Sequence, residues 1–519
     1  MTQENALNIL KTGGNVFLSG EPGSGKTHLI NQYVDYLRAH GVEPAITAST
    51  GIAATHIGGM TIHSWSGIGI KRKLDQYDLD RIASTDRIVR QVGRTRILII
   101  DEVSMLAPET LDMVEAVCRE IKQDEQAFGG LQVILVGDFF QLPPVVKREE
   151  PDPQKTFDDI GGSVKRFAYD ASCWQKADFI TCYLTEQHRQ EDEDFLSVLS
   201  AIRRNEYDEM HHDHIEKRKV LAKDVPDGIP RLFSHNADVD RVNEQELAKI
   251  IEGEQVFEMT SDGVPTIVEA LKKGCLSPEI LKLKVGAKVM FTKNNPRAGF
   301  VNGTLGEVED LSPYSSPTVR LKNGRRVVAE PMDWMVEDGG KVRARIKQVP
   351  LRLAWAITVH KSQGMSLDAA AMDLTDVFEF GQGYVALSRV RSLSGLYLLG
   401  WNNQTFQVHP EVFEKDKEFR ETCEMAGNTF AKLSSKELAD MHHNFIKASG
   451  GKLSDKKNSF DKIQETHPQA YSRWRIEEEN SLKELFEQGK SITDISHLLG
   501  RKTGGIKSRL VKLGLIEED

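Results

Sequence analysis

One short segment near the start of the chain has the residue types and spacing of a phosphate-binding loop. Residues 20–27 read Gly-Glu-Pro-Gly-Ser-Gly-Lys-Thr, after an apolar run and before a helix-forming run. Glycines let successive backbone N–H groups point at a phosphate, and the following helix N-terminus adds partial positive charge. In this pattern the lysine reaches the β- and γ-phosphates, and the final hydroxyl is a magnesium ligand. We therefore expect a nucleoside triphosphate to contact Gly20, Gly23, Ser24, Gly25, Lys26 and Thr27.

A carboxylate pair supplies the groups that hydrolysis of such a nucleotide needs. Asp101 and Glu102 directly follow the four aliphatic residues 97–100. We expect Asp101 to hold magnesium, and Glu102 to orient and deprotonate the attacking water. The alternative is a carboxylate pair that caps a helix over residues 108–122, because acids favour helix starts. The phosphate loop favours hydrolysis.

A glutamine is a candidate sensor of the γ-phosphate. Gln141 lies in the segment 137–145, which begins Gly-Asp-Phe-Phe-Gln and continues through two prolines. An amide beside a catalytic loop can hydrogen-bond a γ-phosphate or its water, and stiff prolines would pass on its movement. An ordinary turn at the end of a strand is the alternative.

Elements of one parallel sheet must position these groups. Continuous apolar runs with polar residues at their carboxyl ends are typical of parallel strands covered on both faces. Ligands of such sheets bind beyond the carboxyl ends, so we expect the functional groups to converge there. The runs are residues 15–18, 45–49, 96–100 and 132–136.

Composition sets limits on the class of protein. A chain of 519 residues, 39% hydrophobic and 28% charged, is typical of several globular domains. No run approaches the ~18 apolar residues that span a membrane, and the N-terminus lacks signal or transit features, which predicts a cytoplasmic protein. Five cysteines without C-x-x-C spacing indicate reduced thiols. A net charge of −10 argues against coating nucleic acid by bulk electrostatics, but leaves room for a local basic channel.

Seven motifs in a fixed order carry a family resemblance. They are residues 48–54, 61–65, 101–106, 137–145, 184–190, 354–364 and 384–391. Together with the phosphate loop they resemble the Pif family of superfamily-1B DNA helicases, the 5′-to-3′ branch that includes RecD-type relatives. The resemblance covers about residues 2–401, and the segment 104–123 favours Pif over a plain RecD-type enzyme.

The resemblance implies an α/β fold with two RecA-like, doubly wound parallel-sheet domains. The second sheet would use residues 231–235, 369–373 and 395–399, and an Asn-Gly turn at 322–325 with short apolar runs indicates antiparallel strands. The expected parts are a first domain (1–185) with a wedge insertion (65–93, by composition a short basic excursion), a second domain (186–410) with a small β-barrel (286–348), a linker or helical extension (411–466), and a helix-turn-helix-like module (467–519).

The resemblance also assigns nucleotide contacts outside the loop. Gln3 matches an adenine-reading glutamine, and Gly364 completes the nucleotide-binding set. Arg189 and Arg389 match two arginines that face the γ-phosphate from the second domain. A guanidinium keeps its charge and binds phosphate oxygens bidentately, which makes this role chemically sound. For either arginine alone, a surface salt bridge is the alternative.

Single-stranded DNA is expected across the tops of both domains. Hydroxyls, backbone donors and rings suit phosphate contact and base stacking without sequence readout. The candidate contacts are Thr50, Gly51, His63, His360, Lys361 and Ser362, and the candidate stacking rings are Trp65, Phe139 and Phe140, for which burial is the alternative.

The last fifty residues form a separate pattern. We expect three short helices, over 477–488 and after Ser491 and Thr503, with Leu498 among the inward residues; residues 434–466 are expected to be a linker. Basic residues crowd the third helix, which favours duplex DNA contact, with protein docking as the alternative. They are Arg501, Lys502, Lys507 and Arg509.

The motifs thus predict an ATP- and Mg²⁺-dependent 5′-to-3′ helicase acting on single-stranded and forked duplex DNA. Four-stranded guanine structures, RNA–DNA hybrids and roles in replication, repair, recombination or telomere maintenance follow from the family alone. The alternatives are a translocase that remodels complexes without unwinding, a RecD-type helicase and a nucleotide-gated scaffold. No membrane partner is expected, and protein partners are not readable.

Overall fold

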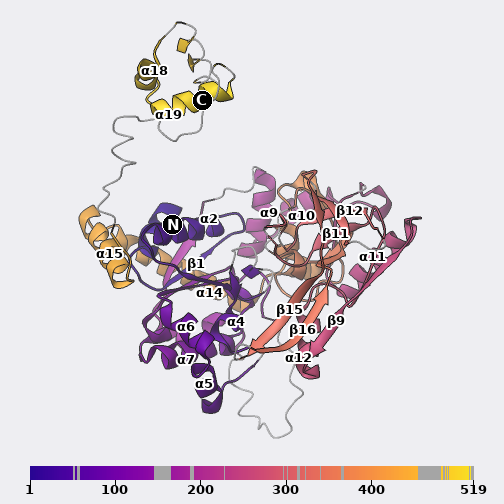
Figure 1. Cartoon of the computed structure of the whole chain (residues 1–519), viewed down its shortest axis with the longest axis horizontal. Helices are drawn as coiled ribbons and strands as arrows, with labels where there is room; N and C mark the ends of the chain where they lie inside the picture. Colours follow the sequence, from indigo (N-terminus) through magenta and orange to yellow (C-terminus); the bar gives the residue numbers. More distant parts are fainter. Residues whose placement is uncertain are drawn as a thin grey trace. The chain divides into compact units, whose positions relative to one another are not determined.

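The computed structural model describes most of the chain, which forms two compact units over residues 1–450 and 451–519 (Figure 1). The described residues are 1–50, 53–54, 59–69, 71–144, 165–186, 192–226, 228–295, 297–300, 302–312, 316–321, 323–338, 341–363, 367–453, 478, 481–482, 485–486, 488, 490–513 and 515. Within these residues, no helix combines the length and apolar character needed to cross a bilayer.

The first sheet is six-stranded and entirely parallel, in the order β3-β2-β4-β5-β1-β6. Its strands are β1 (Val16–Gly20), β2 (Ala45–Ala48), β3 (Met60–Thr61), β4 (Ile97–Asp101), β5 (Gln132–Val136) and β6 (Ile180–Leu184). The four predicted strands are confirmed. Most of their aliphatic side chains are buried because helices cover both faces of the sheet, while Ala45 and Ile46 on β2 are half-buried.

Helices complete this first lobe, which we define as the first sheet with the helices that pack on it. They are α1 (Gln3–Leu10), α2 (Lys26–Ala39), α4 (Ile62–Ser66), α5 (Gln76–Ala83), α6 (Asp86–Arg94), α7 (Pro108–Lys122) and α8 (Ser172–Lys176). The predicted helix over 108–122 is confirmed, with its proline in the first turn. The insertion 65–93 is helical rather than a loop, because Ile82, Ile88 and Val92 pack into the core.

The second lobe is built on a four-stranded parallel sheet in the order β18-β7-β19-β20. Its strands are β7 (Arg231–Phe233), β18 (Ala356–Thr358), β19 (Ala370–Leu374) and β20 (Leu396–Trp401), and its helices are α9 (Glu193–Arg204), α10 (Glu209–Glu216), α11 (Asn236–Lys249) and α13 (Gln382–Leu387). Three strands were predicted. The fourth, β18, lies inside a motif that the sequence marked only for function.

An antiparallel region interrupts the second lobe. Its strands form a five-stranded sheet (β14-β13-β12-β11-β17), a three-stranded sheet (β15-β16-β9) and a two-stranded ribbon (β10-β8). They are β8 (Gln255–Glu258), β9 (Thr260–Gly263), β10 (Ile280–Leu283), β11 (Lys288–Phe291), β12 (Leu305–Asp310), β13 (Thr318–Leu321), β14 (Arg326–Val328), β15 (Met332–Asp338), β16 (Lys341–Gln348) and β17 (Leu351–Leu353), with α12 (Pro265–Gly274) beside them. This region extends beyond the expected range 286–348 at both ends, and the small β-barrel stays a prediction.

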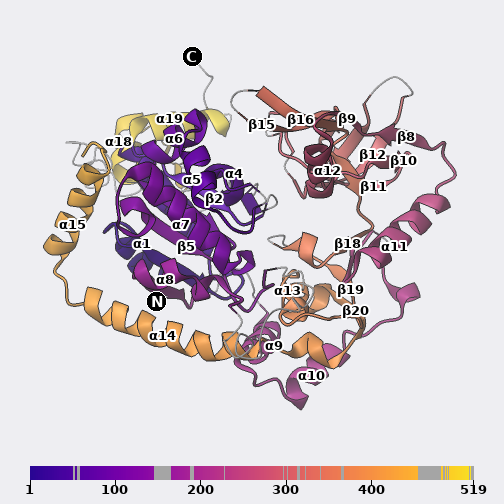
Figure 2. The ribbon, with the colours of Figure 1, turned by 90° about the horizontal axis from the view of Figure 1, so that it is seen from below.

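Two helices lead from the second lobe back to the first. Figure 2 shows α14 (Pro410–Phe430) running along the first lobe toward α15 (Ser435–Ala448). On α14, Phe419 packs its ring 4.8 Å from that of Phe17 and 6.0 Å from that of Phe139. The prediction of a linker from residue 434 is wrong over α15, because Ser434 and Glu437 form a capping box that starts this helix.

The second unit has a small core of its own. This core buries four aliphatic side chains, those of Leu482, Ile495, Ile506 and Leu510. Ile495 lies on α18 (Ile492–Leu498), and Ile506 and Leu510 lie on α19 (Thr503–Lys512). Ser491 caps α18 as predicted, accepting the N–H of Asp494 at 3.1 Å. Leu498 was expected to face inward but is 58% exposed, because it falls on the outer side of this short helix.

Phe419→Ala should lower the free energy of unfolding by about 3–5 kcal/mol, since it empties the space that α14 fills against the first sheet. The measurement is the midpoint of urea unfolding. Met425 lies on the same helix but is 60% exposed. Met425→Ala should therefore change the free energy of unfolding by less than about 0.5 kcal/mol. Equal effects of the two substitutions would contradict this account of α14.

Candidate active site

The phosphate loop joins β1 to α2 at the carboxyl edge of the first sheet. Gly25 stands at the N-cap of α2 with φ 86°, a left-handed conformation that favours glycine. Lys26 is directed into the loop, where its ammonium donates to the carbonyl oxygens of Gly20 (2.7 Å) and Glu21 (3.1 Å). Burial lowers the pKa of Lys26, while the charges of Asp138, Glu102 and Asp101 oppose this. Phosphate oxygens of a bound nucleotide would replace those carbonyls as the hydrogen-bond acceptors of the lysine ammonium.

Gln3 lies beside this loop, as the family resemblance implied. Its amide Nε2 donates to the carbonyl of Ser24 at 3.2 Å, and its backbone N–H donates to a carboxylate oxygen of Glu186 at 3.1 Å. The hydroxyl of Ser24 is buried with no hydrogen-bond partner among the described residues. A buried hydroxyl of this kind in a glycine loop suits a phosphate oxygen.

The carboxylate pair ends β4, next to the loop. Burial and the charge of Glu102 raise the pKa of Asp101 to about 7. Burial also raises the pKa of Glu102, while the charges of Arg389 and Lys26 lower it. Glu102 has φ 51°, a strained conformation for a residue with a side chain. The carboxylates therefore lie among the cations that a phosphate would also meet.

A residue that sequence reasoning did not single out joins the two lobes at this point. Gln363, just beyond β18 in the second lobe, donates from Nε2 to Glu102 at 3.1 Å and lies 3.4 Å from Oε1 of Gln141. Both partners belong to the first lobe. Gln363 stands within one of the quoted motifs, but nothing in its local sequence indicated partners more than 200 residues away.

Gln141 and its neighbours are pressed against the second lobe. Gln141 is buried, and Gly381 at the N-cap of α13 approaches the same loop. A Cβ on Gly381 would lie 2.4 Å from the carbonyl oxygen of Phe140, and its φ of 78° also requires glycine. The loop with the predicted sensor is thus in direct contact with the helix that precedes Arg389.

Of the two predicted arginines, the structure describes one. Arg389 is buried and donates to the carbonyl of Val385 (2.8 Å) and the hydroxyl of Ser388 (2.7 Å). It is shielded from bulk water, and its positive charge lowers the pKa of Glu102 in the first lobe. Arg189 lies outside the described residues, as do Gly364 and Gly51.

A second unpredicted residue, Arg203, anchors the same seam. From the end of α9 its guanidinium donates to both oxygens of Asp138 at 2.8 Å, and it also contacts the hydroxyls of Tyr183 and Tyr384. Arg203 and Asp138 are almost completely buried. Asp138 stands three residues before Gln141, so this ion pair fixes the base of the sensor loop.

Comparison with known proteins places this geometry in a family. Residues 3–212 match the PIF1-like helicases, and residues 267–311 match the 2B domain of DNA helicase Pif1. An ATP-dependent DNA helicase Pif1 from Psychrobacter sp. is 42% identical, over 87% of this chain and 76% of the relative. The chain belongs to the PIF1-like helicase family.

Solved Pif1 helicases agree with this fold. The crystal structure of Pif1 from Candida albicans has TM-score 0.71 and 33% identity, covering 80% of this chain and 98% of that one. Bacteroides Pif1 bound to single-stranded DNA has TM-score 0.66 and 30% identity, covering 81% and 96%. The α/β fold with two RecA-like lobes is thereby confirmed for this Pif1-family chain.

The residues predicted to contact DNA differ in how exposed they are in the structure. His63 on α4 is half-buried, and burial lowers its pKa. Thr50 lies beside Ser49, whose hydroxyl donates to the backbone carbonyl of Glu102 at 2.8 Å, so this edge is tied to the backbone that carries Glu102. Ser362 is fully buried and its hydroxyl donates to Val359 at 2.8 Å, so the prediction of a hydroxyl contact to DNA is not supported.

The three candidate stacking rings are core residues instead. Trp65, Phe139 and Phe140 are all buried. Phe139 packs in the aromatic cluster around Phe419, and the guanidinium of Arg203 lies 4.2 Å from the ring centroid of Phe140. Their aromatic character serves packing, because each lies beneath the surface of the first lobe.

The basic residues of the second unit are not equivalent either. Arg501 is only 4% exposed and pairs with Glu478 at 2.9 Å, so it holds the small core together rather than facing a ligand. Lys507 is exposed, while Lys502 and Arg509 are half-buried. The predicted duplex contact therefore depends on Lys502, Lys507 and Arg509.

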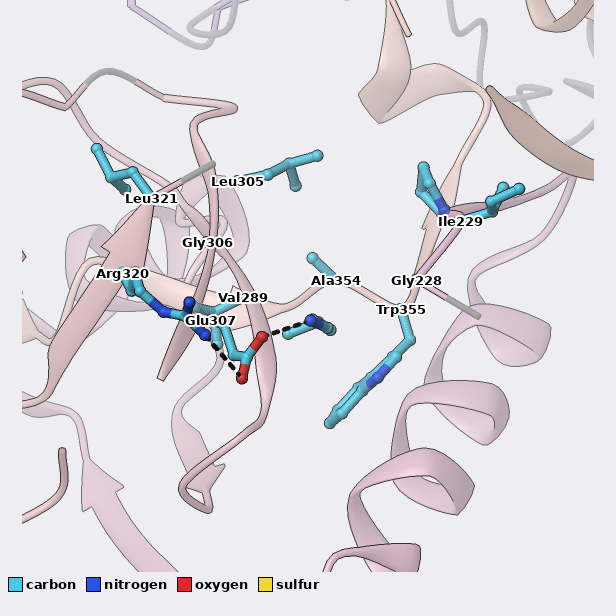
Figure 3. A pocket seen from close by; sticks show the side chains of 12 residues that line it. Gly228, Ile229, Val289, Leu305, Gly306, Glu307, Arg320, Leu321, Ala354 and Trp355 are labelled. Atoms are coloured by element: carbon cyan, nitrogen blue, oxygen red, sulfur yellow. Dashed lines mark hydrogen bonds and ion pairs between the residues drawn. The ribbon is translucent and has the colours of Figure 1, made fainter. Parts of the chain in front are cut away.

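A pocket of about 260 Å³ lies apart from these residues, between the second sheet and the antiparallel region (Figure 3). Trp355 and Ile229 line one side, and Glu307 lies on the other with ion pairs to Lys288 (2.6 Å) and Arg320 (3.6 Å). None of the predicted site residues lines this pocket.

Gln363→Ala should lower the turnover number for ATP by up to about a hundredfold, because Glu102 loses the amide that positions it across the seam. The Michaelis constant for ATP should change little, since the phosphate loop is intact. Steady-state hydrolysis with single-stranded DNA measures both. Gln407→Ala, which removes an exposed glutamine of the same lobe, is the control, and undiminished turnover in Gln363→Ala would show that the bridge is not used.

Proposed function

We propose that the protein is a motor that couples ATP hydrolysis in the seam between its lobes to 5′-to-3′ movement on single-stranded DNA, and so separates duplexes. The observation that carries the proposal is the hydrogen bond from Gln363, in the second lobe, to Glu102 in the first, where the charge of the buried Arg389 also lowers the pKa of Glu102. A nucleotide bound there would touch both lobes, so its cleavage would change how they pack.

The proposed roles follow from the positions described. The phosphate loop with Lys26 binds the triphosphate, Gln3 contacts the base, and Glu102 orients the attacking water. Arg389 stabilises the charge that develops on the transferred phosphate, and we assign Arg189 to the same task. Hydrolysis thus requires both lobes. For this reason the proposal favours a motor over a static scaffold.

Magnesium is part of the proposal. Such ions are held by one or two protein side chains together with substrate phosphates, so no dedicated cluster of ligands is needed. Asp101 fits this role, because its carboxyl is crowded by Glu102 and a divalent cation would relieve that repulsion. The hydroxyl of Thr27, in the first turn of α2, would be the second ligand. When bound, the ion would supply charge neutralisation for the substrate phosphates.

The DNA path is assigned to the carboxyl edges of both sheets. Thr50 and His63 stand at this edge of the first lobe, and His360 and Lys361 at that of the second. The ammonium of Lys361 is held by the side-chain oxygen of Asn236 at 2.9 Å. We assign the second unit to duplex contact through Lys502, Lys507 and Arg509, since Arg501 is committed to its core.

A forked duplex tests the motor and its direction together. The protein should unwind a fork with a 5′ single-stranded tail and leave one with only a 3′ tail intact, with fluorescence of a displaced strand as the measurement. Arg389→Ala should reduce ATP turnover about a thousandfold and abolish unwinding. Arg391→Ala removes an exposed neighbour paired with Asp368 and should unwind normally. Turnover stimulated by DNA without strand separation would identify a translocase, and unwinding from a 3′ tail would reverse the polarity.

The affinity for oligo-dT should fall as the pH rises from about 7 to 9. Burial lowers the pKa of Lys361 to about 8, with the charge of Arg352 acting in the same direction and Asp240 opposing it. The Lys361 side chain is therefore charged at neutral pH and loses its proton at higher pH. One phosphate contact is then weakened, which lowers the affinity on the order of threefold to tenfold. Lys361→Arg keeps its charge throughout. Its binding should be independent of pH, and an equal fall in both proteins would rule Lys361 out.

A further inference from the structure

Two neighbouring hollows open at the amino edge of the first parallel sheet, the edge opposite the phosphate loop. Their volumes are about 590 and 570 Å³, and they share Arg96 and Ser449. We define the two together as the amino-edge groove. Five of its lining residues each directly precede a strand of the sheet, namely Asn15, Pro44, Gly59, Arg96 and Leu131. Ligands of parallel sheets bind at the carboxyl edge, so this groove is separate from the nucleotide site and the proposed DNA path.

Buried hydrogen bonds fix the floor of the first hollow. The side chain of Gln132 is buried, and its Nε2 donates to the carbonyls of Leu10 and Gly14, each at 2.9 Å. Asn15 donates from Nδ2 to the carbonyl of Ala177 at 2.7 Å. The hollow is therefore preformed, because the backbone segments around it are tied together through two amide side chains.

Helix α15 supplies one wall of the groove. Phe445 and Ser449 line it, and the ring of Phe445 packs so closely on Gly13 that a Cβ there would lie 2.2 Å from the ring. One turn earlier, Nε2 of His442 lies 2.9 Å from the carbonyl oxygen of Asn8. The helix is thus held on the first lobe by a close apolar contact and a polar one.

The groove is basic, although the whole chain is acidic. Its lining basic side chains are Arg38, Arg94, Arg96 and Lys176. Arg38 is committed to Glu43, the acid that lines the same groove, with 2.6 Å between Nη2 and the carboxylate. The other three are exposed and form no ion pair within the part of the chain that the structure describes. A protein with a net charge of −10 thus keeps uncompensated positive charge at this one edge.

The backbone that carries the two arginines is anchored. Lys122, on α7, donates to the carbonyls of Gly93 (2.9 Å) and Thr95 (2.6 Å), which flank Arg94. Burial lowers the pKa of Lys122, and the charge of Arg96 acts in the same direction. The positive charges are therefore concentrated at a fixed place.

The walls between these charges are apolar. The lining side chains include those of Val42, Met60, Trp65, Leu131 and Phe445. The indole N–H of Trp65 is buried and has no hydrogen-bond acceptor among the described residues. An indole N–H can donate but not accept, and buried donors are normally satisfied. A carboxylate oxygen that enters the groove is the kind of acceptor this wall lacks.

We propose that the amino-edge groove docks an acidic segment of a partner protein, in which carboxylates alternate with aromatic or large aliphatic side chains. The carboxylates would pair with Arg94, Arg96 and Lys176, and the apolar side chains would fill the two hollows. A nucleic-acid backbone would meet the same charges but leave the apolar walls uncovered, so the protein segment fits better. Because the groove lies at the opposite edge from the phosphate loop, a docked partner leaves the nucleotide site free.

Fluorescence anisotropy of a labelled peptide tests the groove with the full chain. The probe repeats two glutamates and a phenylalanine three times. It should bind more tightly than a peptide with serine in place of phenylalanine, or with glutamine in place of glutamate. The double variant Arg94→Glu with Arg96→Glu should weaken binding at least about tenfold, because like charges then face each other. Lys176→Glu, on the separate helix α8, should weaken it in the same direction.

Arg87→Glu is the matched control, since Arg87 is exposed on the same helix as Arg94 and does not line the groove. It should bind the probe as the wild type does, and ATP turnover with single-stranded DNA should be unchanged in every variant, which also shows that each one folds. Absence of probe binding to the wild type, or equal binding by the double variant and Arg87→Glu, would overturn the inference.

A duplex oligonucleotide separates the two classes of ligand. Duplex binding that depends on Arg94 and Arg96, together with peptide binding that does not, would identify a nucleic-acid site and overturn the protein partner. The motor is judged by a different measurement. Loss of DNA-stimulated turnover in the wild type would refute the proposed function and leave the groove standing.

Discussion

The buried pairing of Arg203 with Asp138 is the interaction on which the seam depends. Two charges removed from water are tolerated only when their hydrogen bonds are satisfied, and removing one partner costs about 3–5 kcal/mol. Arg203 meets this condition with Asp138, Tyr183 and Tyr384, while Asp416 lies 3.7 Å away on α14. The pair joins the end of β5 to α9, α13 and α14. This end of the seam therefore behaves as a fixed pivot.

The proposed motor requires one lobe to move against the other. This movement would then be concentrated at the second contact, where Gln363 donates hydrogen bonds to Glu102 and Gln141. These are single hydrogen bonds between neutral amides and one carboxylate, much weaker than the network around Arg203. Phosphate oxygens and the attacking water would compete for the same groups. For the proposed motor, a strong contact beside a weak, exchangeable one suits a change in the angle between the lobes that does not separate them.

Much of the fold could be predicted because it is encoded locally. Aliphatic runs located seven of the ten strands in the two parallel sheets, and the phosphate loop identified the site. Arg203 could not be found in this way: Arg203 and Arg204 are adjacent at the end of α9, yet one is buried and the other exposed. The sequence shows two arginines, and only partners from other elements decide which one enters the core. Gln363 was missed for the same reason, while Arg501 was misjudged because its partner Glu478 lies on another segment of the second unit.

The acidic balance of the chain limits how it can hold DNA. With a net charge of −10, binding by diffuse electrostatics would be weak and sensitive to salt. Local groups must supply the affinity instead. Lys361, whose ammonium is held by the side-chain oxygen of Asn236 at 2.9 Å, provides one such attraction, which salt screens. A motor exchanges such contacts at each step, so a chain with this charge must keep local contacts on both lobes if it is to stay bound while one lobe moves.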